Sequence, residues 1–276
     1  METLKALNKD FYCSAGSELN NIDCQNLLSL DNSIDVPKVY DLGFLIVKNV
    51  ISKEEIKKAR DSYFNLFNKG EYKRYHNDWI HIRNHVDSHG CKNHPSKKFL
   101  ESQEFLKISK SIILKKISAK LLRSNTTTLC PRMIVRSFSK LSERCTFAHR
   151  DKEYFKSKQP NNVITCWIPM GFVGSNNGQL IYLIDSHKKK EKIDKLVNSE
   201  KIISKDFKNL SNKLNLKWYR PIIDIGDIIF HSLDIIHASF DSNSEIPRLS
   251  IDLRFAASNE DLDPRWSSKW RGDDGL

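Results

Sequence analysis

Three residues of this sequence have the types and the spacing to hold a metal ion. His149 and Asp151 stand two positions apart in "FAHRDKEYF". Side chains two apart on an extended strand point to the same face, so an imidazole nitrogen and a carboxylate oxygen could bind one divalent ion. A third ligand must come from elsewhere, and "FHSLDIIHASF" offers His231 and His237. Two histidines and one carboxylate form the facial triad of non-haem Fe(II) oxygenases, which leaves positions open for a co-substrate and O₂.

Arg248 has the chemistry to bind an anionic co-substrate beside such an ion. It follows His237 by eleven residues, in a strand-like segment that could run back beside that histidine. A buried guanidinium facing the metal would bind a dicarboxylate through a two-point fork. The alternatives are structural: a surface hydrogen bond between His149 and Asp151, and a surface salt bridge for Arg248.

The elements that must position these residues change in kind along the chain, with helices first. The sequence predicts a strand over 43–50, a helix over 52–70 that opens with a capping box of Ser52 and Glu55, and a second helix over 103–122. The residues expected on the inward faces are Ile56, Ala59, Tyr63, Leu66 and Phe67 of the first helix and Phe105, Ile108, Ile112, Ile117 and Leu121 of the second.

The half of the chain after Asn125 has the sequence pattern of a β-sandwich or barrel. Short apolar segments there are separated by Gly, Asn, Pro and charged residues. The segment 187–219 interrupts them and is interpreted as a partly helical excursion. The strand-like segments are 131–138, 162–172, 178–184, 227–230 and 247–255.

The array of His149, Asp151, His237 and Arg248 resembles the phytanoyl-CoA dioxygenase family of Fe(II)/2-oxoglutarate oxygenases. The likeness extends from about residue 40 to the end of the chain. Its other elements are Trp167 in "TCWIPM", Ser239 in "HAS", the Gly226-Asp227 turn, the Ser186-His187 pair, the entry segment "GFLIVKNVISKEEI" and the tail "DPRWSSKWRGDDG".

This resemblance implies a fold and a set of roles. The fold is mainly β with flanking helices, a cupin-like double-stranded β-helix or jelly roll. One oxygenase domain would span 1–276, with a helical part over about 1–125, a β-helix core over about 126–258 and a tail over 259–276. The cofactors would be Fe(II), 2-oxoglutarate as co-substrate and O₂. The implied iron ligands are His149, Asp151 and His237, and the implied 2-oxoglutarate residues are Arg248, Ser239 and Trp167.

The remaining histidines are not expected to bind the iron, and one residue that binds 2-oxoglutarate in the family, a lysine, has no assigned position here. His231 is set aside because its spacing to Arg248 does not fit, and His187 is expected to be structural. The family's 2-oxoglutarate-binding lysine is expected upstream of the barrel without an aligned position. In 76–94, which holds five of the nine histidines, His81, His85 and His89 recur every four residues. This segment is expected to cap the barrel mouth, with a second metal site as the weaker alternative.

The expected activity is hydroxylation of an unactivated C–H bond of a small molecule. Family halogenases carry Ala or Gly where Asp151 stands here, so the resemblance implies hydroxylation, with desaturation or cyclisation as other outcomes. We expect a tailoring step in secondary metabolism on an anionic, alkaloid-like substrate. The alternatives are a jelly roll that binds metal without oxidation, as an isomerase or binding protein, and a basic binding protein without activity.

Composition sets limits on partners and compartment. The net charge is +11, and 188–220 has eleven Lys and Arg against four acidic residues. This excess is interpreted first as a solvated insertion and second as a rim that attracts an anionic substrate. Nucleic acid and membrane are not expected as partners. The six cysteines are scattered and no signal peptide is recognised, so a cytoplasmic protein with reduced thiols is expected.

Overall fold

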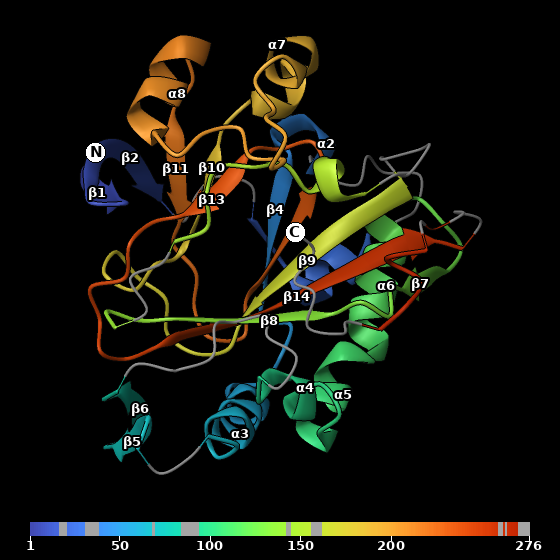
Figure 1. Cartoon of the computed structure of the whole chain (residues 1–276). Helices are drawn as coiled ribbons and strands as arrows, with labels where there is room; N and C mark the ends of the chain where they lie inside the picture. Colours follow the sequence, from blue (N-terminus) through green and yellow to red (C-terminus); the bar gives the residue numbers. More distant parts are fainter. Residues whose placement is uncertain are drawn as a thin grey trace.

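The protein is built from two facing β-sheets, with helices packed on the outside of the larger one (Figure 1). From β9 to β14 the chain passes back and forth between the two sheets, with β10 and β11 adjacent in the smaller one, and the fold is a jelly roll, as the family resemblance implies. The computed structural model describes residues 1–16, 21–30, 39–67, 70–83, 94–141, 145–155, 162–258, 262 and 264–269.

The larger sheet forms one wall of the site. Its strand order is β3 (Asn21–Asp23), β4 (Phe44–Lys48), β12 (Ile228–Ser232), β9 (Val163–Pro169), β14 (Arg248–Ala257) and β7 (Thr127–Leu129), and β8 (Ile134–Phe138) also pairs with β14. The smaller sheet forms the other wall. Its order is β1 (Glu2–Ala6), β2 (Lys9–Gly16), β11 (Trp218–Pro221), β10 (Leu180–Leu183) and β13 (His237–Ser239).

The capping box predicted at Ser52 is confirmed. It opens α3 (Lys53–Phe64), where the Ser52 hydroxyl accepts from the backbone N–H of Glu55 and the Glu55 side chain returns to Ser52. Ile56, Ala59 and Tyr63 are buried as expected. The helix ends earlier than Gly70, and Leu66, predicted to be inward, is 36% exposed because it lies beyond the last helical turn.

The helix predicted over 103–122 is two helices, α5 (Gln103–Ser109) and α6 (Ile112–Leu121). The hydroxyl of Ser111 accepts from the N–H of Ile113 and so begins a new helix with its own axis. The restart turns Ile112 outward, where it is 71% exposed, so its predicted burial is wrong. Phe105, Ile108, Ile117 and Leu121 are buried.

The N-terminal hairpin of β1 and β2 is absent from the sequence-based prediction. Its turn consists of Leu7 and Asn8, both with positive φ, and the carboxylate of Asp241 accepts both backbone N–H groups. A positive φ at both turn residues matches the right-handed twist of the two strands. The first 125 residues therefore contribute strands to both sheets in addition to helices.

The excursion over 187–219 is partly helical, as predicted, and it contacts the segments that carry the candidate ligands. Its helix α7 (Lys190–Asp194) begins with Lys190, whose Nζ lies 2.6 Å from Oδ2 of the buried Asp234. Asp194 accepts from the buried Arg150. The remaining elements are α1 (Cys24–Ser29), α2 (Val39–Leu42), α4 (Ser96–Phe99), α8 (Phe207–Leu214), β5 (Tyr72–Tyr75), β6 (Asp78–His81), η1 (Asp151–Tyr154) and η3 (Ser186–Lys188).

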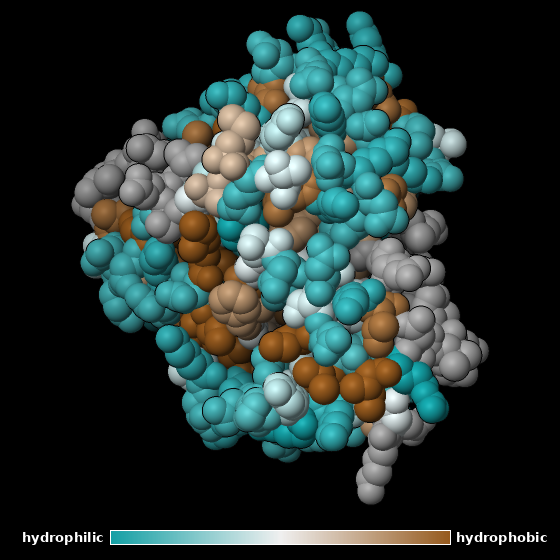
Figure 2. All heavy atoms as spheres, turned by 90° about the vertical axis from the view of Figure 1, so that its left-hand side faces the viewer, coloured by the Kyte–Doolittle hydropathy of each residue, from teal (hydrophilic) through white to brown (hydrophobic). Residues whose placement is uncertain are grey.

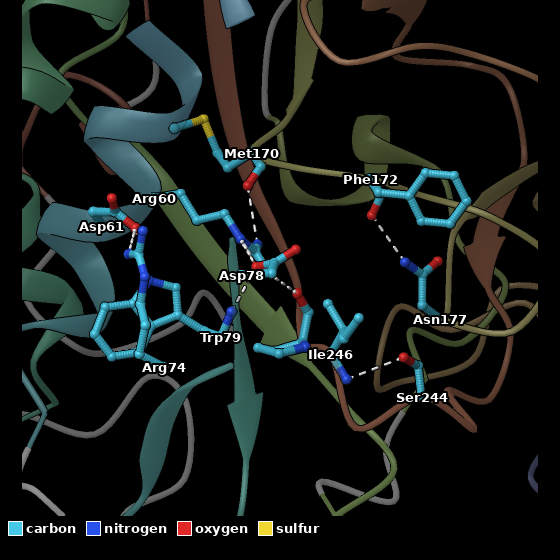
Figure 3. Close-up of polar contacts among 11 residues, drawn as sticks. Arg60, Asp61, Arg74, Asp78, Trp79, Met170, Phe172, Asn177, Ser244 and Ile246 are labelled. Atoms are coloured by element: carbon cyan, nitrogen blue, oxygen red, sulfur yellow. Dashed lines mark hydrogen bonds and ion pairs between the residues drawn. The ribbon is translucent and has the colours of Figure 1, made fainter. Parts of the chain in front are cut away.

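A buried guanidinium fastens three separate segments below the barrel (Figure 3). Arg60 of α3 donates to Oδ1 of Asp78 at 2.6 Å, and to the carbonyl oxygens of Met170 and Pro247 at 3.0 and 2.9 Å. Gly171 has a φ of +145°, and a Cβ there would lie 2.9 Å from the Arg60 guanidinium. The clamp thus joins α3, the β5–β6 hairpin and the loops that flank β14 and follow β9.

The surface is mainly hydrophilic on the face that Figure 2 shows, with smaller groups of hydrophobic side chains gathered in its hollowed middle. Most large apolar side chains are inside, as burial of apolar surface requires. Among the residues described, no helix combines the length and the hydrophobicity that crossing a bilayer demands.

Candidate metal and co-substrate site

Local backbone pairing brings the two candidate histidine ligands side by side. His149 and His237 form an antiparallel bridge, with N–H to O=C distances of 3.1 and 3.0 Å between their backbones. Their rings are 4.3 Å apart. Arg150 is extended, with φ −117° and ψ 142°, and Asp151 is the first residue of η1. The predicted extended geometry therefore holds up to Arg150, after which the chain turns.

The ligand atoms of His149, Asp151 and His237 all lie within 4.8 Å of one another. The Nε2 atoms of His149 and His237 are 3.8 and 3.6 Å from Oδ1 of Asp151. Each Nδ1 faces a backbone carbonyl oxygen, that of Phe147 at 2.7 Å and that of Ile235 at 3.1 Å. An Nδ1 that donates to a carbonyl leaves the Nε2 lone pair directed at the carboxylate. Two lone pairs and an anion repel one another, so this arrangement suits a divalent cation.

The protonation states also suit a cation. Burial lowers the pKa of His149, and it lowers the pKa of His237 further because His149 and His231 lie nearby. Burial alone would raise the pKa of Asp151. The Arg254 guanidinium, with His231 and His237, holds that pKa well below its usual value instead. Two neutral imidazoles and an ionised carboxylate are the forms that bind metal.

The competing histidine His231 lies on the other side of the carboxylate. Its Nε2 is 3.4 Å from Oδ2 of Asp151, and its Nδ1 is 2.9 Å from the Tyr182 hydroxyl. His237 instead shares Oδ1 with His149. Within the part of the chain that the structure describes, the cluster able to hold a metal therefore contains His237 and not His231.

Arg248 and Trp167 meet inside the barrel. The Arg248 guanidinium carbon is 5.9 Å from the Trp167 ring centroid and 4.4 Å from that of Phe138. Its Nη1 donates to Ser250, while its buried Nε has no hydrogen-bond partner among the described residues. Burial lowers the pKa of Arg248 to about 9, against the opposing charge of Asp252. A carboxylate would both pair this charge and satisfy the open donor.

Ser239 stands two residues after His237, on β13. Its hydroxyl accepts from the backbone N–H of Thr146 at 2.7 Å, so it helps to fix the strand edge next to the histidines. His187 lies outside the metal cluster, with Nε2 3.1 Å from the Asp41 carbonyl oxygen, which agrees with its structural role.

The spacing of four between His81, His85 and His89 would place them on one face only if the segment were helical, and His81 does not lie on a helix. His81 is the last residue of strand β6, and its Nδ1 contacts the hydroxyl of Ser139. A strand has a period of two, so a spacing of four there does not place side chains on a helix face. His85 and His89 lie outside the described residues.

Several residues around Asp151 escaped the sequence analysis. Thr165 and Arg254 contact its Oδ2, and Trp266 packs on Arg254. Arg254 lies six residues after Arg248 on β14, and an even spacing on a strand puts both on the interior face. The same alternation relates Thr165 to Trp167 on β9. The alternation was therefore the signal available in the sequence.

Comparison with known proteins agrees with this architecture. The chain is similar to the epimerase SnoN from nogalamycin biosynthesis in complex with Fe3+, alpha ketoglutarate and nogalamycin RO, with TM-score 0.60 and 14% identity over 87% of this chain and 86% of that one. It is similar to the carbocyclase SnoK, with TM-score 0.59 and 14% identity over 82% and 84%. It also resembles EctD from S. alaskensis with 2-oxoglutarate and 5-hydroxyectoine, with TM-score 0.56 and 12% identity over 96% and 90%.

These likenesses concern the fold, since the identities are low. A search of curated proteins finds no matching sequence. The family model for phytanoyl-CoA dioxygenase (PhyH) matches residues 40–250, which contain the metal cluster and Arg248. That match covers most of the chain, and the protein is therefore a member of the phytanoyl-CoA dioxygenase family.

Proposed function

We propose that this protein is an Fe(II)- and 2-oxoglutarate-dependent oxygenase acting on a small molecule. The observation that carries the proposal is the convergence of two Nε2 lone pairs and Oδ1 of one ionised carboxylate within 4.8 Å, in a member of this family. His149, Asp151 and His237 would hold the iron. The whole of 1–276 would act as one oxygenase domain. When bound, iron with 2-oxoglutarate would activate O₂, which is the oxidant: one oxygen atom would go to succinate as 2-oxoglutarate loses CO₂, and the other to an unactivated C–H bond of the substrate.

Arg248 would bind the distal carboxylate of 2-oxoglutarate. Its guanidinium is buried, lies over Trp167 and has an open Nε donor. A carboxylate accepts two parallel hydrogen bonds from such a group, which fixes its orientation. Ser239 would support the same end of the co-substrate from the opposite sheet. The buried rings of Trp167 and Tyr182 would keep water away from the reacting carbon.

We expect hydroxylation because Asp151 is present as a carboxylate ligand. Two proteins with similar folds catalyse different reactions, an epimerisation in SnoN and a carbocyclisation in SnoK, and their names do not define the reaction of this protein. The alternative is a jelly roll that binds metal without oxidation. The buried, incompletely paired Arg248 favours the oxygenase, because a site without an anionic co-substrate has no use for that charge.

The substrate that we propose carries an anionic group. Arg136 of β8 faces the interior, as Phe138 does two residues later, and its Nε is 3.5 Å from Oδ2 of Asp252. The Arg136 side chain is 27% exposed to solvent. Arg136, Arg248 and Arg254 all face this interior, where their positive charges would attract an anionic group of the substrate.

Anaerobic addition of Fe(II) and 2-oxoglutarate to the protein tests the function. A weak visible absorption band should appear, and it should require both additions. Succinate release on exposure to O₂ then reports oxidative turnover, and a metabolite panel with matched acids and methyl esters reports the substrate class. Binding of Fe(II) with neither a band nor succinate would favour the non-oxidative alternative.

A further inference from the structure

The carboxylate of Asp151 is divided between two environments. Its Oδ1 faces the Nε2 atoms of His149 and His237. Its Oδ2 accepts from the Thr165 hydroxyl at 2.5 Å and lies 3.1 Å from Nη2 of Arg254, which donates to it. Since Oδ2 is occupied by protein donors, Oδ1 is the oxygen left for an ion. The carboxylate would therefore bind through one oxygen and keep the other coordination positions open.

The two donors to Oδ2 act as a unit. Thr165 and Arg254 are directly opposite in the antiparallel pairing of β9 and β14. Side chains opposite each other on one face of a sheet lie side by side, so the register of these strands sets both donors at the same level. The Arg254 guanidinium thus holds Oδ2 together with the Thr165 hydroxyl and with His231, whose Nε2 lies 3.4 Å away.

Little besides Asp151 and an aromatic ring restrains that guanidinium. The Nε and Nη1 atoms of Arg254 are buried and have no hydrogen-bond partner among the described residues. The guanidinium carbon lies 4.9 Å from the ring centroid of Trp266, which itself is 2% exposed. A desolvated cation over an indole is attracted by the ring and can move only if the ring moves.

The indole of Trp266 also grips the turn that carries Asp151. Its Nε1 donates to the Tyr154 carbonyl oxygen at 2.7 Å. Its ring stacks on Phe155, with centroids 4.2 Å apart and planes 16° apart. Tyr154 ends the short helix η1 that Asp151 begins, and Phe155 follows it. One side chain therefore contacts both the helix that bears the carboxylate and the guanidinium that holds its outer oxygen.

We propose that Trp266, in the C-terminal segment, is a positioning residue for the iron site and acts through Arg254 on Oδ2 of Asp151. The inference rests on the proposed function for the identity of the ion. It extends the site beyond the region that the family model matches, which ends at residue 250. Without the indole, Arg254 could leave Oδ2, and the carboxylate would be free to rotate.

The chain offers a matched control for this role in Trp218. It is also buried, its Nε1 donates to the Phe207 carbonyl oxygen at 2.9 Å, and its ring packs on Phe11 and Phe207. Its contacts belong to the core between α8 and the smaller sheet. Replacing either tryptophan removes a similar amount of packing and one similar hydrogen bond, but only Trp266 contacts the Asp151 assembly.

The experiment compares Trp266→Leu with Trp218→Leu in the full chain. Co(II) affinity is titrated through its visible spectrum, and the thermal midpoint of the metal-free protein is recorded. We expect Trp266→Leu to weaken Co(II) binding by about 10- to 100-fold, as for other residues that orient metal ligands. The Co(II) spectrum should also change, because the carboxylate is repositioned. Trp218→Leu should lower the midpoint and leave affinity and spectrum at the wild-type values.

Equal losses of Co(II) affinity in the two variants would overturn the proposal. If the Leu variants do not fold, the pair Trp266→Phe and Trp218→Phe gives the same comparison with milder changes. The double variant Trp266→Leu/Arg254→Gln should bind Co(II) no more weakly than Arg254→Gln alone, and additive losses would show that Trp266 does not act through Arg254. A wild-type protein that binds Co(II) but gives no band with Fe(II) and 2-oxoglutarate would contradict the proposed function and leave this test intact.

Discussion

At the scale of single residues, the choice of the distal ligand depends on the two oxygens of Asp151. His231 and His237 both approach that carboxylate, at 3.4 and 3.6 Å, but from opposite oxygens. We expect His149→Ala, Asp151→Ala and His237→Ala each to abolish stoichiometric Fe(II) binding and turnover, since each removes one of three ligands. Iron content after desalting measures this, and circular dichroism confirms that the variants fold.

His231→Ala is the matched control for these variants. It should retain an iron-binding site, because its Nε2 does not share Oδ1 with His149. Iron binding that survives in His237→Ala and is lost in His231→Ala would show that the distal ligand is His231.

Arg248 gives a second prediction at this scale. Arg248→Ala should raise the KM for 2-oxoglutarate strongly, because loss of a buried fork to a carboxylate weakens binding by about 2–5 kcal/mol. The KM for the organic substrate should change much less and serves as the internal control. Steady-state succinate release at varied 2-oxoglutarate measures both. An unchanged KM for 2-oxoglutarate would mean that another basic residue binds the co-substrate.

At the scale of elements, the Arg60 clamp explains how loops remote in sequence stay together below the barrel (Figure 3). Arg60→Met should reduce the free energy of unfolding by about 3 kcal/mol, because it leaves Asp78 and two backbone carbonyls without their buried partner. Denaturant unfolding measures the loss. Lys58→Met, on the same helix and 67% exposed, should change stability very little. Similar effects for the two variants would contradict the clamp.

The excursion over 187–219 is interpreted from sequence as a solvated insertion, and its tertiary contacts show that some of its charges are structural. Lys190 pairs with the buried Asp234 and Asp194 with the buried Arg150, so part of the charge of α7 stabilises the loops next to the candidate ligands. Lys192 and Lys195 of the same segment are exposed. The lysine-rich stretch therefore contains both structural and solvated charges.

At the scale of the whole molecule, the net charge of +11 and the interior arginines favour attraction of an anionic substrate. We expect kcat/KM for such a substrate to fall as salt is raised from low to high, because screening acts over about 10 Å at 0.1 M. The kcat should stay constant, since attraction affects encounter and not the chemical step. Lys192→Gln/Lys195→Gln should reduce the salt dependence if the excursion contributes to it.

A neutral ester of the same substrate is the control for this prediction. Its kcat/KM should not depend on salt. A salt-independent kcat/KM for the acid would exclude long-range attraction as a property of this surface.

The sequence by itself determined the features that depend on near neighbours. The residue types at 149 and 151, with their spacing of two, predict a shared face on extended backbone, and the structure brings both side chains to one point with His237. Ser52 and Glu55 predict the start of α3, because a cap needs only the next turn. The short apolar segments separated by Gly, Asn, Pro and charged residues predict a sandwich or barrel, since strands and the turns between them depend on near neighbours.

Only the tertiary structure decided what depends on register and packing. It separated His231 from His237, placed Thr165 opposite Arg254 and brought Trp266 from the end of the chain onto the turn of Asp151. It also divided the helix predicted over 103–122 into two. Contacts between strands far apart in sequence are selected by the packing of the whole core, and that selection leaves no periodic signal in either strand.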